Sequence, residues 1–417
     1  MLLWSVVYSE QAAPNRIRMI LVLGALVALG PLTIDMYLPA LPTIGEDLAV
    51  TSSVVQLTLT GTLAGLALGQ LIIGPLSDSL GRRRPLIGGI VLHIVASVIC
   101  LLAPNVAVLG VGRVLQGMGA AAGMVVALAV VGDLYRDRAA ATMMSRLMLV
   151  LGVAPVLAPS LGAAVLLHGS WRWVFAALVV LAGLLLLMGA LSLPETLPPS
   201  HRPPLRIRGV AGTYVRLLKD VRFVVLIFVA ALAMAGLFAY IAGASFVLQD
   251  RYGIDQQQFA LLFGAGAVAL IASTQTNPVL LKWFSPLRIV ITALSVAAVA
   301  SAVFLGLAAT HTGGVYGFLV PVWTILAAMG LVMPNAPALA LSRHPESAGT
   351  AAALMGAGQF GLGAVVAPLV GVLGNDQLAM AVVMAVSVVI ALVALLTVRP
   401  PAHSPALADA ALSTEVA

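Results

Sequence analysis

The stretch "LPETLPPSHRPPLRIRGVAGTYVRLLKD", residues 193–220, is the longest hydrophilic segment of a chain that is otherwise strongly apolar. Of the 417 residues, 61% are hydrophobic and 9% are charged, whereas soluble domains carry about 25% charged residues. In lipid, only helices and closed barrels satisfy their backbone polar groups. The apolar runs are long and continuous, without the alternation of barrel strands. The predicted fold class is therefore all-α integral membrane.

Apolar windows on both sides of this segment predict twelve spans, because each crossing needs about 20 residues of helix. Six spans precede the segment and six follow it. This predicts an N-terminal six-helix bundle (17–193), a cytoplasmic linker (194–221) and a C-terminal six-helix bundle (222–398). The predicted spans are 17–39, 51–76, 85–103, 106–131, 139–167, 173–193, 222–249, 256–281, 286–308, 315–341, 347–374 and 376–398.

Two short repeats indicate that the bundles are related by pseudo-symmetry. "APSLG" (158–162) in the fifth span recurs as "APLVG" (367–371) in the eleventh, and "GMG" (117–119) in the fourth recurs as "AMG" (328–330) in the tenth. Both pairs lie at nearly the same offset. Matches in corresponding spans are what two parallel repeats produce.

The basic residues predict the orientation. If the N-terminus (1–16) is cytoplasmic, all but four of the 21 Lys and Arg residues fall in cytoplasmic segments; the exceptions are Arg113, Arg146, Arg172 and Arg251. The positive-inside rule therefore places both termini in the cytoplasm, including a polar tail (399–417) that is expected to be disordered. A multi-pass membrane protein is predicted. Its net charge of +6 needs no nucleic-acid partner.

Several classes of chemistry lack a sequence signal. A single cysteine, Cys100, excludes an internal disulfide and a cysteine metal cluster. Neither a zinc-like histidine spacing nor a Walker phosphate-binding loop is present. We therefore expect no enzyme activity, cofactor or metal.

"GPLSDSLGRRRP" (74–85) joins the second and third spans. An ordinary positive-inside loop explains its arginines but not its spacing. The loop resembles the signature G-x-L-a-D-R-x-G-R-K/R of the major facilitator superfamily, which implies a gating role for Gly74, Asp78, Gly81, Arg82 and Arg83. Ser79 stands where the family usually has Arg, so a gating ion pair must be weaker, absent or supplied by Arg82 to Arg84.

"GRVLQGMGAAAG" (112–123) places Arg113 about two turns into the fourth span. A buried arginine costs several kcal/mol unless it is paired, so it marks a functional site or a structural ion pair. The stretch resembles the superfamily motif R-x-x-Q-G. This resemblance implies a part in proton coupling for Arg113.

"LGVAPVLAPSLGAAV" (151–165) places two prolines in the fifth span. Pro155 and Pro159 bend the helix, while Gly152 and Gly162 allow close packing; prolines are also tolerated in spans generally. The pattern resembles the antiporter motif of exporters in this superfamily, with Ala158 and Ala163 in place of common glycines.

Segments 133–159, 246–270 and 334–371, together with "IDMYLPALP" (34–42), are similar to the Bcr/CflA group of drug:proton antiporters. The resemblance covers about residues 17–398 and implies the superfamily's twelve-span fold, a location in the bacterial inner membrane and proton-driven export of drugs.

Asp35 is the acidic residue inside the first span. We expect it about one turn from the outer end, at a depth close to that of Arg113. A pair between them is sterically plausible: burial favours the protonated carboxyl group, and a nearby guanidinium favours the ionised form. Asp35 is then the proton site, unless it is an N-cap or loop residue near Pro39.

Residues expected to line a substrate cavity are Tyr37, Gln56, Gln116, Tyr240, Asn335 and Gln359. Arg146 is expected to snorkel to the interface.

The preferred function is a monomeric, proton-coupled exporter of small amphiphilic compounds that works by rocking of the two halves in the lipid. Export of a metabolite such as an amino acid is an alternative, as is an uncoupled facilitator. A non-transporting receptor would need neither the carboxylate nor the arginine.

Overall fold

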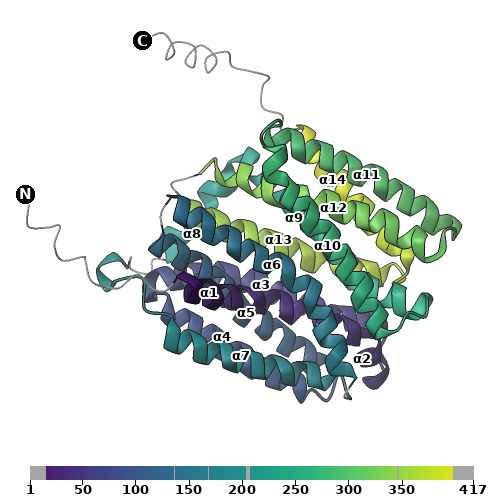
Figure 1. The fold of residues 1–417 in the computed structure, drawn as a ribbon, viewed down its shortest axis with the longest axis horizontal. Helices are drawn as coiled ribbons and strands as arrows, with labels where there is room; N and C mark the ends of the chain where they lie inside the picture. The colour runs from purple at the N-terminus through teal and green to yellow at the C-terminus, as the bar shows by residue number, and fades with distance from the viewer. Residues whose placement is uncertain (1–15, 136, 168, 203–206, 345–346, 398–417) are drawn as a thin grey trace, which may run out of the picture.

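The computed structural model describes residues 16–135, 137–167, 169–202, 207–344 and 347–397, which form helices and no strand (Figure 1). Twelve of these helical stretches are long and apolar enough to cross a membrane, which confirms the predicted number. The predicted segments 1–16, apart from Arg16, and 399–417 lie outside the described residues.

The N-terminal half contains six spans. Its elements are α1 (Arg16–Asp35), the 3₁₀ turn η1 (Leu38–Ala40), α2 (Leu41–Asp47), α3 (Ser52–Leu80), α4 (Arg83–Leu101), α5 (Val106–Leu134), α6 (Asp137–Leu166) and α7 (Arg172–Ser192).

The C-terminal half also contains six spans. Its elements are α9 (Val221–Phe246), the π-helical turn η3 (Val247–Arg251), α10 (Gln256–Leu280), α11 (Pro286–Thr310), α12 (Gly314–Leu341), α13 (Ala348–Val372) and α14 (Gln377–Thr397).

Side-chain caps begin several of these helices where the sequence leaves the apolar run. Asn105 accepts from the backbone N–H of Val108 at the start of α5, and Ser285 accepts from that of Arg288 at the start of α11. Asp220 and Asp255 cap α9 and α10 in the same way. Each cap satisfies backbone N–H groups that the first turn leaves unpaired.

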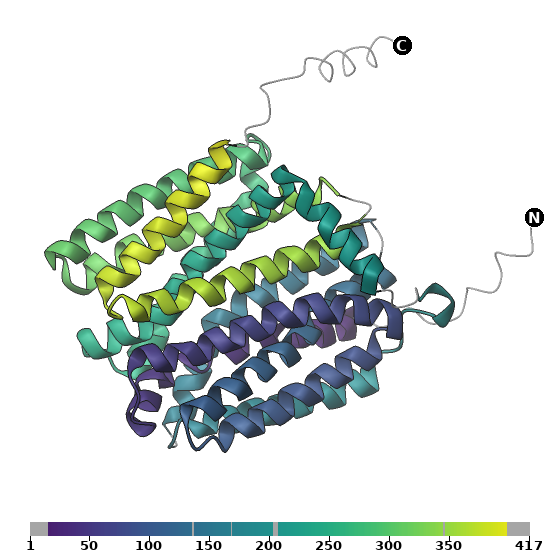
Figure 2. The ribbon, with the colours of Figure 1, turned by 180° about the vertical axis from the view of Figure 1, so that it is seen from behind.

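The two halves lie side by side, and their helices run in roughly the same direction across the molecule (Figure 1). From behind, α3 and α13 run next to one another along the boundary (Figure 2). On the other side, α6 packs against α10. These two helix pairs form most of the surface between the halves.

The first span is longer than predicted, and it is broken. The stretch Ile17–Asp47 is one candidate span, in which α1 ends at Asp35 and the chain continues through η1 and α2. Pro39 and Pro42 each stand in the first turn of a new segment, where a missing N–H is tolerated. The prolines therefore restart the helix. Asp35 lies deeper than the single turn expected from the sequence.

The linker is not fully extended. After the turn η2 (Pro199–His201), α8 (Ile207–Lys219) lies against α9 and α13. Leu217 of α8 is buried with Phe223 and Ala351, and Arg216 donates to the Ser347 hydroxyl at 2.8 Å. We call the end of the molecule that holds α8 the linker end, and the opposite end, with α2, the far end.

Six hydrogen bonds between described residues connect the halves, and all six of these lie at the far end. They join Ser53 to the Gly371 carbonyl, Gln56 to the Ala242 carbonyl and to the Asn375 side chain, Ser245 to the Leu38 carbonyl, Gln256 to Thr43, and Gln257 to the Ala163 carbonyl. This set of bonds seals the far end in the conformation described.

Candidate functional site

Asp35 is the last residue of α1 and is 3% exposed. Its Oδ1 atom has no hydrogen-bond partner, and Asp35 makes no ion pair with any described residue. It is not an N-cap, because the residue before η1 is Tyr37. A buried carboxyl group without a partner is rare in proteins and calls for a functional explanation.

Asp35 faces the C-terminal half. Helix α9 passes the break after α1, where Ser245 donates to the Leu38 carbonyl at 2.8 Å. Tyr240, about one turn earlier on α9, lies within electrostatic range of Asp35, and its hydroxyl group is also buried without a partner. Two unpaired polar groups therefore meet at the boundary between the halves.

Arg113 is fully buried in α5, inside the N-terminal half. Its Nη1 donates to the Thr33 carbonyl at 2.9 Å and to Gln116 Oε1 at 2.7 Å. The guanidinium carbon lies 4.3 Å from the centre of the Tyr37 ring, a distance at which the ring face attracts a cation. Nε and Nη2 have no partner. Part of the hydrogen-bonding capacity of this cation is therefore unused.

The expected pairing of Asp35 with Arg113 is not present in this conformation. Thr33 directs its side chain to His93 of α4 and its carbonyl group to Arg113. Successive helical residues are about 100° apart, so Asp35 lies about 200° around α1 from Thr33. Similar depth alone does not bring the two charged groups together. Asp35 projects from one face of α1, and the Arg113 side chain lies against another face of the same helix.

A hydrogen-bonded chain connects Arg113 to His93, which the sequence analysis missed. Gln116 accepts from Arg113 and donates to Ser97 Oγ at 2.8 Å. Ser97 Oγ in turn donates to the His93 backbone carbonyl at 2.7 Å and lies 3.4 Å from His93 Nδ1. His93 Nε2 lies 2.9 Å from Thr33 Oγ1. Since the Thr33 hydroxyl donates to the Leu29 carbonyl, His93 is the donor in this last contact. A histidine inside an apolar run was the available signal.

Aromatic side chains line the C-terminal side of this region. The Tyr240 ring stacks on Phe263 of α10 with centroids 5.1 Å apart. One turn further along α10, Gly266 lies beside the Trp323 indole of α12, whose Nε1 is buried without a partner. Tyr240 was predicted from the sequence, but Phe263 and Trp323 were not, because aromatic residues in spans usually serve only as packing.

The six predicted cavity residues do not form one cluster. Tyr37 lies under Arg113 and bonds to Thr58 at 2.7 Å, and Tyr240 lies near Asp35. Gln116 is buried inside the N-terminal half. Gln56 belongs to the far-end bonds, where its amide group reaches two acceptors of the other half.

The remaining two predicted cavity residues lie elsewhere. Asn335 donates to Asn277 at 2.6 Å and so joins α12 to α10. Gln359 is half-buried on α13. Sequence reasoning predicted polarity inside spans correctly but not which neighbour each amide group satisfies.

Arg82 is the centre of the loop between α3 and α4. It bonds to Asp78 at 2.5 Å, to Ser77 at 2.8 Å and, through Nε and Nη2, to both carboxylate oxygens of Asp133 on α5. Hydrogen bonds to a carboxylate in this forked geometry are strong. The basic partner that Ser79 cannot supply is therefore Arg82. The other predicted loop arginine, Arg83, is exposed and reaches the Ala190 carbonyl.

Glu195 closes this loop from the other side and was missed by the sequence analysis. Its carboxylate accepts from the backbone N–H groups of Arg82 and Arg83 and pairs with Arg202 at 3.5 Å. Partial burial raises the pKa of Glu195, but these bonds outweigh that effect and hold the pKa below its usual value.

The two loop glycines differ in role. Gly81 has φ +88°, in the region that favours glycine. A side chain at Gly81 would also meet Glu195 and Arg202. Gly74 lies on α3 facing α13, where the nearest atom to an added Cβ would be that of Ala353 at 4.0 Å.

The predicted antiporter motif lies on α6 and contacts both halves. An added Cβ at Gly152 would lie 3.2 Å from Ile271 of α10, whereas one at Gly162 would collide with the backbone carbonyl of Met36, next to Asp35. Pro155 and Pro159 both lie inside α6, half-buried and buried respectively. The side chain of Arg146, nearer the start of α6, is exposed, as snorkelling requires.

Two six-helix halves with a partnerless buried carboxyl group where they meet define a membrane transport protein. A family model described as the Major Facilitator Superfamily matches residues 22–368. The chain belongs to this superfamily, as its loop and span-4 motifs predicted.

Three bacterial relatives are similar over most of their length. The chain is 39% identical to "Uncharacterized MFS-type transporter YdgK" of Bacillus subtilis, with 90% of this chain and 94% of the relative covered. It is 31% identical to "Bicyclomycin resistance protein homolog" of Haemophilus influenzae (86% and 90% covered). It is 33% identical to "Chloramphenicol resistance protein" of Pseudomonas aeruginosa (85% and 83% covered). The predicted resemblance to the drug-resistance group is thereby confirmed.

Among solved structures, the fold is similar to that of the xylose transporter XylE from E. coli in a partially occluded inward open conformation. The TM-score is 0.72 at 14% identity, with 92% of this chain and 98% of the other covered. This similarity supports the fold.

Proposed function

We propose that this protein is a drug:proton antiporter of the bacterial inner membrane that exports small amphiphilic compounds by alternating access. The observation that carries the proposal is the partnerless Asp35 carboxyl group, buried where the halves meet. The names of two relatives, which refer to resistance to bicyclomycin and chloramphenicol, support drugs as the substrate class.

Asp35 binds the coupling proton. Burial without a partner favours the neutral, protonated carboxyl group, and access to water or a cationic group favours the ionised form. When the halves rock, Asp35 moves relative to Tyr240 of the other half, and its proton affinity changes. Arg113 lies on the other face of α1 and contributes positive potential through the same helix break.

The substrate binds between Asp35 and the aromatic side chains of Tyr240, Phe263 and Trp323. These rings supply apolar surface, and the unpaired Tyr240 hydroxyl and Trp323 Nε1 supply polar contacts. Aromatic surface with a few polar groups suits amphiphilic ligands. A bound cationic or polar group beside Asp35 would favour loss of its proton.

Both termini are cytoplasmic in this proposal, and the protein acts as a monomer surrounded by lipid. The far end, sealed by six hydrogen bonds, then faces outward, so the described conformation accepts substrate from the linker end. A proton moving inward down a potential of 100 mV releases about 2.3 kcal/mol. That supports a somewhat less than hundredfold gradient of a neutral substrate per proton.

The test is transport by proteoliposomes with an imposed pH gradient. Asp35→Asn is expected to abolish gradient-driven accumulation while substrate counterflow continues, because the amide group cannot carry the proton. Asp250→Asn, an exposed acid at the far end, is the matched control and should transport normally. Uphill transport by Asp35→Asn with unchanged dependence on the gradient would refute the assignment.

A further inference from the structure

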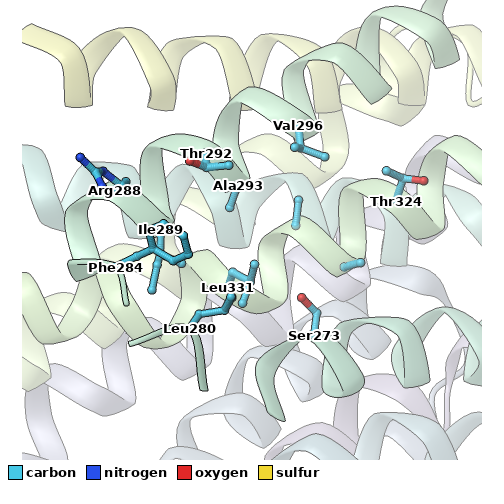
Figure 3. A pocket seen from close by; sticks show the side chains of 12 residues that line it. Ser273, Leu280, Phe284, Arg288, Ile289, Thr292, Ala293, Val296, Thr324 and Leu331 are labelled. Atoms are coloured by element: carbon cyan, nitrogen blue, oxygen red, sulfur yellow. The ribbon is translucent and has the colours of Figure 1, made fainter. Parts of the chain in front are cut away.

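A groove of about 360 Å³ lies in the C-terminal half, away from Asp35 (Figure 3). It runs between α10 and α11, with α12 as its floor. Its lining comes from helix faces with the spacing of successive turns: Ser273 and Leu280 on α10; Phe284 in the connecting loop; Arg288, Ile289, Thr292, Ala293 and Val296 on α11; and Thr324, Ala327, Ala328 and Leu331 on α12.

The groove opens toward the lipid. Helices α10 and α11 both pack on α12, and between them the side chains of Phe284 and Val296 are 42% and 46% exposed. Val296 lies in the middle of the span Pro286–Thr310, so hydrocarbon meets the groove there. An unfilled hollow would lose dispersion contacts along its whole lining. A flexible acyl chain of a bilayer lipid can fill the hollow and restore these contacts.

One end of the groove is positively charged. Arg288 stands at that end, next to Phe284 and Ile289, while Thr324 and Val296 lie toward the other end (Figure 3). Within the described part of the chain, the Arg288 side chain makes no ion pair or hydrogen bond: the bond to Ser285 uses its backbone N–H. The loop before α11 adds a second cation, Lys282, and no acidic residue lines the groove.

The charged end lies at the depth of lipid head groups. It is at the linker end, where α10 finishes and α11 starts. The neighbouring Trp283 is 68% exposed, and exposed tryptophan is enriched at membrane–water interfaces. An apolar groove thus leads from an interfacial, unpaired arginine into the hydrocarbon layer.

We propose that this groove is a binding site for one anionic phospholipid of the leaflet at the linker end. One acyl chain lies along Ala293, Val296 and Ala328, and the phosphate binds Arg288 and Lys282. Guanidinium groups favour phosphate because they donate parallel hydrogen bonds.

A second hollow of the molecule provides a contrast. It lies between α1, α6 and α7 and has a volume of about 470 Å³. Its lining, made of Leu32, Met36, Leu161, Ala164, Val165, Ala177 and Leu181, carries no charge. The two hollows are therefore similar in volume. Of these two, the first groove alone combines an apolar lining with a cationic side chain, Arg288, that can bind an anionic lipid head group.

The experiment is native mass spectrometry of the full-length protein after exchange into mixed micelles containing equal amounts of phosphatidylglycerol and phosphatidylethanolamine. The wild type is expected to retain one phosphatidylglycerol. Arg288→Ala should weaken retention about fivefold, from the loss of one cation near an anionic surface, and Val296→Trp should abolish it by filling the groove.

Two matched variants control for general effects. Arg222→Ala removes an exposed arginine from the linker end of the same half, and Val303→Trp adds a ring to a lipid-facing site on α11 beyond the groove. Both should retain the lipid as the wild type does. Equal retention of both lipids, insensitivity to Arg288→Ala and Val296→Trp, or loss in the controls as well would each overturn the proposal.

Discussion

Arg113 donates from Nη1 to the backbone carbonyl of Thr33, at 2.9 Å, but forms no hydrogen bond or ion pair with Asp35, which follows Thr33 by two residues. The carboxyl and guanidinium groups thus share the break in the first span but lie on opposite faces of it. Arg113 belongs to the interior of the N-terminal half, and Asp35 to the boundary with the C-terminal half. In the proposed mechanism, this separation lets Asp35 exchange its proton without first breaking an ion pair.

His93 is expected to position Arg113 through Thr33, Ser97 and Gln116. His93→Ala should leave buried polar groups unpaired, at about 1–3 kcal/mol of stability, and should lower gradient-driven transport more than counterflow. His93→Gln restores an amide donor near Thr33 and should recover part of both. Thermal unfolding and proteoliposome transport measure these effects; an unchanged coupling ratio in His93→Ala would show that His93 serves stability alone.

Gly162 should tolerate no larger residue. In Gly162→Ala the new Cβ would overlap the Met36 carbonyl, so α6 or the end of α1 must shift next to Asp35. We expect transport to fall at least tenfold, since displacements near 1 Å at a functional site have such effects. Gly183→Ala in α7, where an added Cβ meets nothing within 4 Å, is the control and should be neutral or slightly stabilising. Equal activity of the two variants would contradict the packing role.

Gln56 should hold the far end closed. Gln56→Ala removes its bonds to Ala242 and Asn375, and two bonds of about 1 kcal/mol each would shift the population toward open states about thirtyfold. Spin labels at Val111→Cys and Tyr316→Cys, in a Cys100→Ala background, report the opening as a longer distance distribution. Gln258→Ala, an exposed glutamine on α10, should leave the distribution unchanged.

Asp220 should make stability depend on pH. Its carboxylate binds Arg343 and His344 and caps α9. Partial burial raises the pKa of Asp220, but these bonds together outweigh it and hold the pKa below its usual value. The unfolded chain then binds the proton more readily, so the contribution is complete above about pH 4 and disappears as the pH falls through the folded-state pKa.

Asp220→Asn isolates this charge, because asparagine is an equally good cap. The variant should melt at a lower temperature than the wild type at pH 7, and the two melting curves should converge toward pH 3. A difference in melting temperature that is the same at every pH would mean that the charge of Asp220 does not cause the pH dependence of stability.

The twelve spans, their pairing into halves and the family could be predicted from the sequence, because apolar length and motif spacing are local properties. Side-chain direction was harder. Asp35 and Arg113 were expected at similar depths, yet the turn of the helix puts them on different faces. Gln56 and Asn335 were expected in a cavity, but each satisfies a neighbour that is distant in the sequence. His93, Asp133 and Glu195 acquire their partners only through the packing of α4, α5 and the linker.

The central claim is that Asp35 carries the coupling proton, and the most direct measurement is substrate-induced proton release by purified protein in unbuffered detergent solution. The wild type is expected to release about one proton per bound substrate near neutral pH, because ligand beside Asp35 favours the ionised form. Asp35→Asn should bind substrate and release none. Release of the same number of protons by Asp35→Asn would contradict the account and move the proton site elsewhere in the protein.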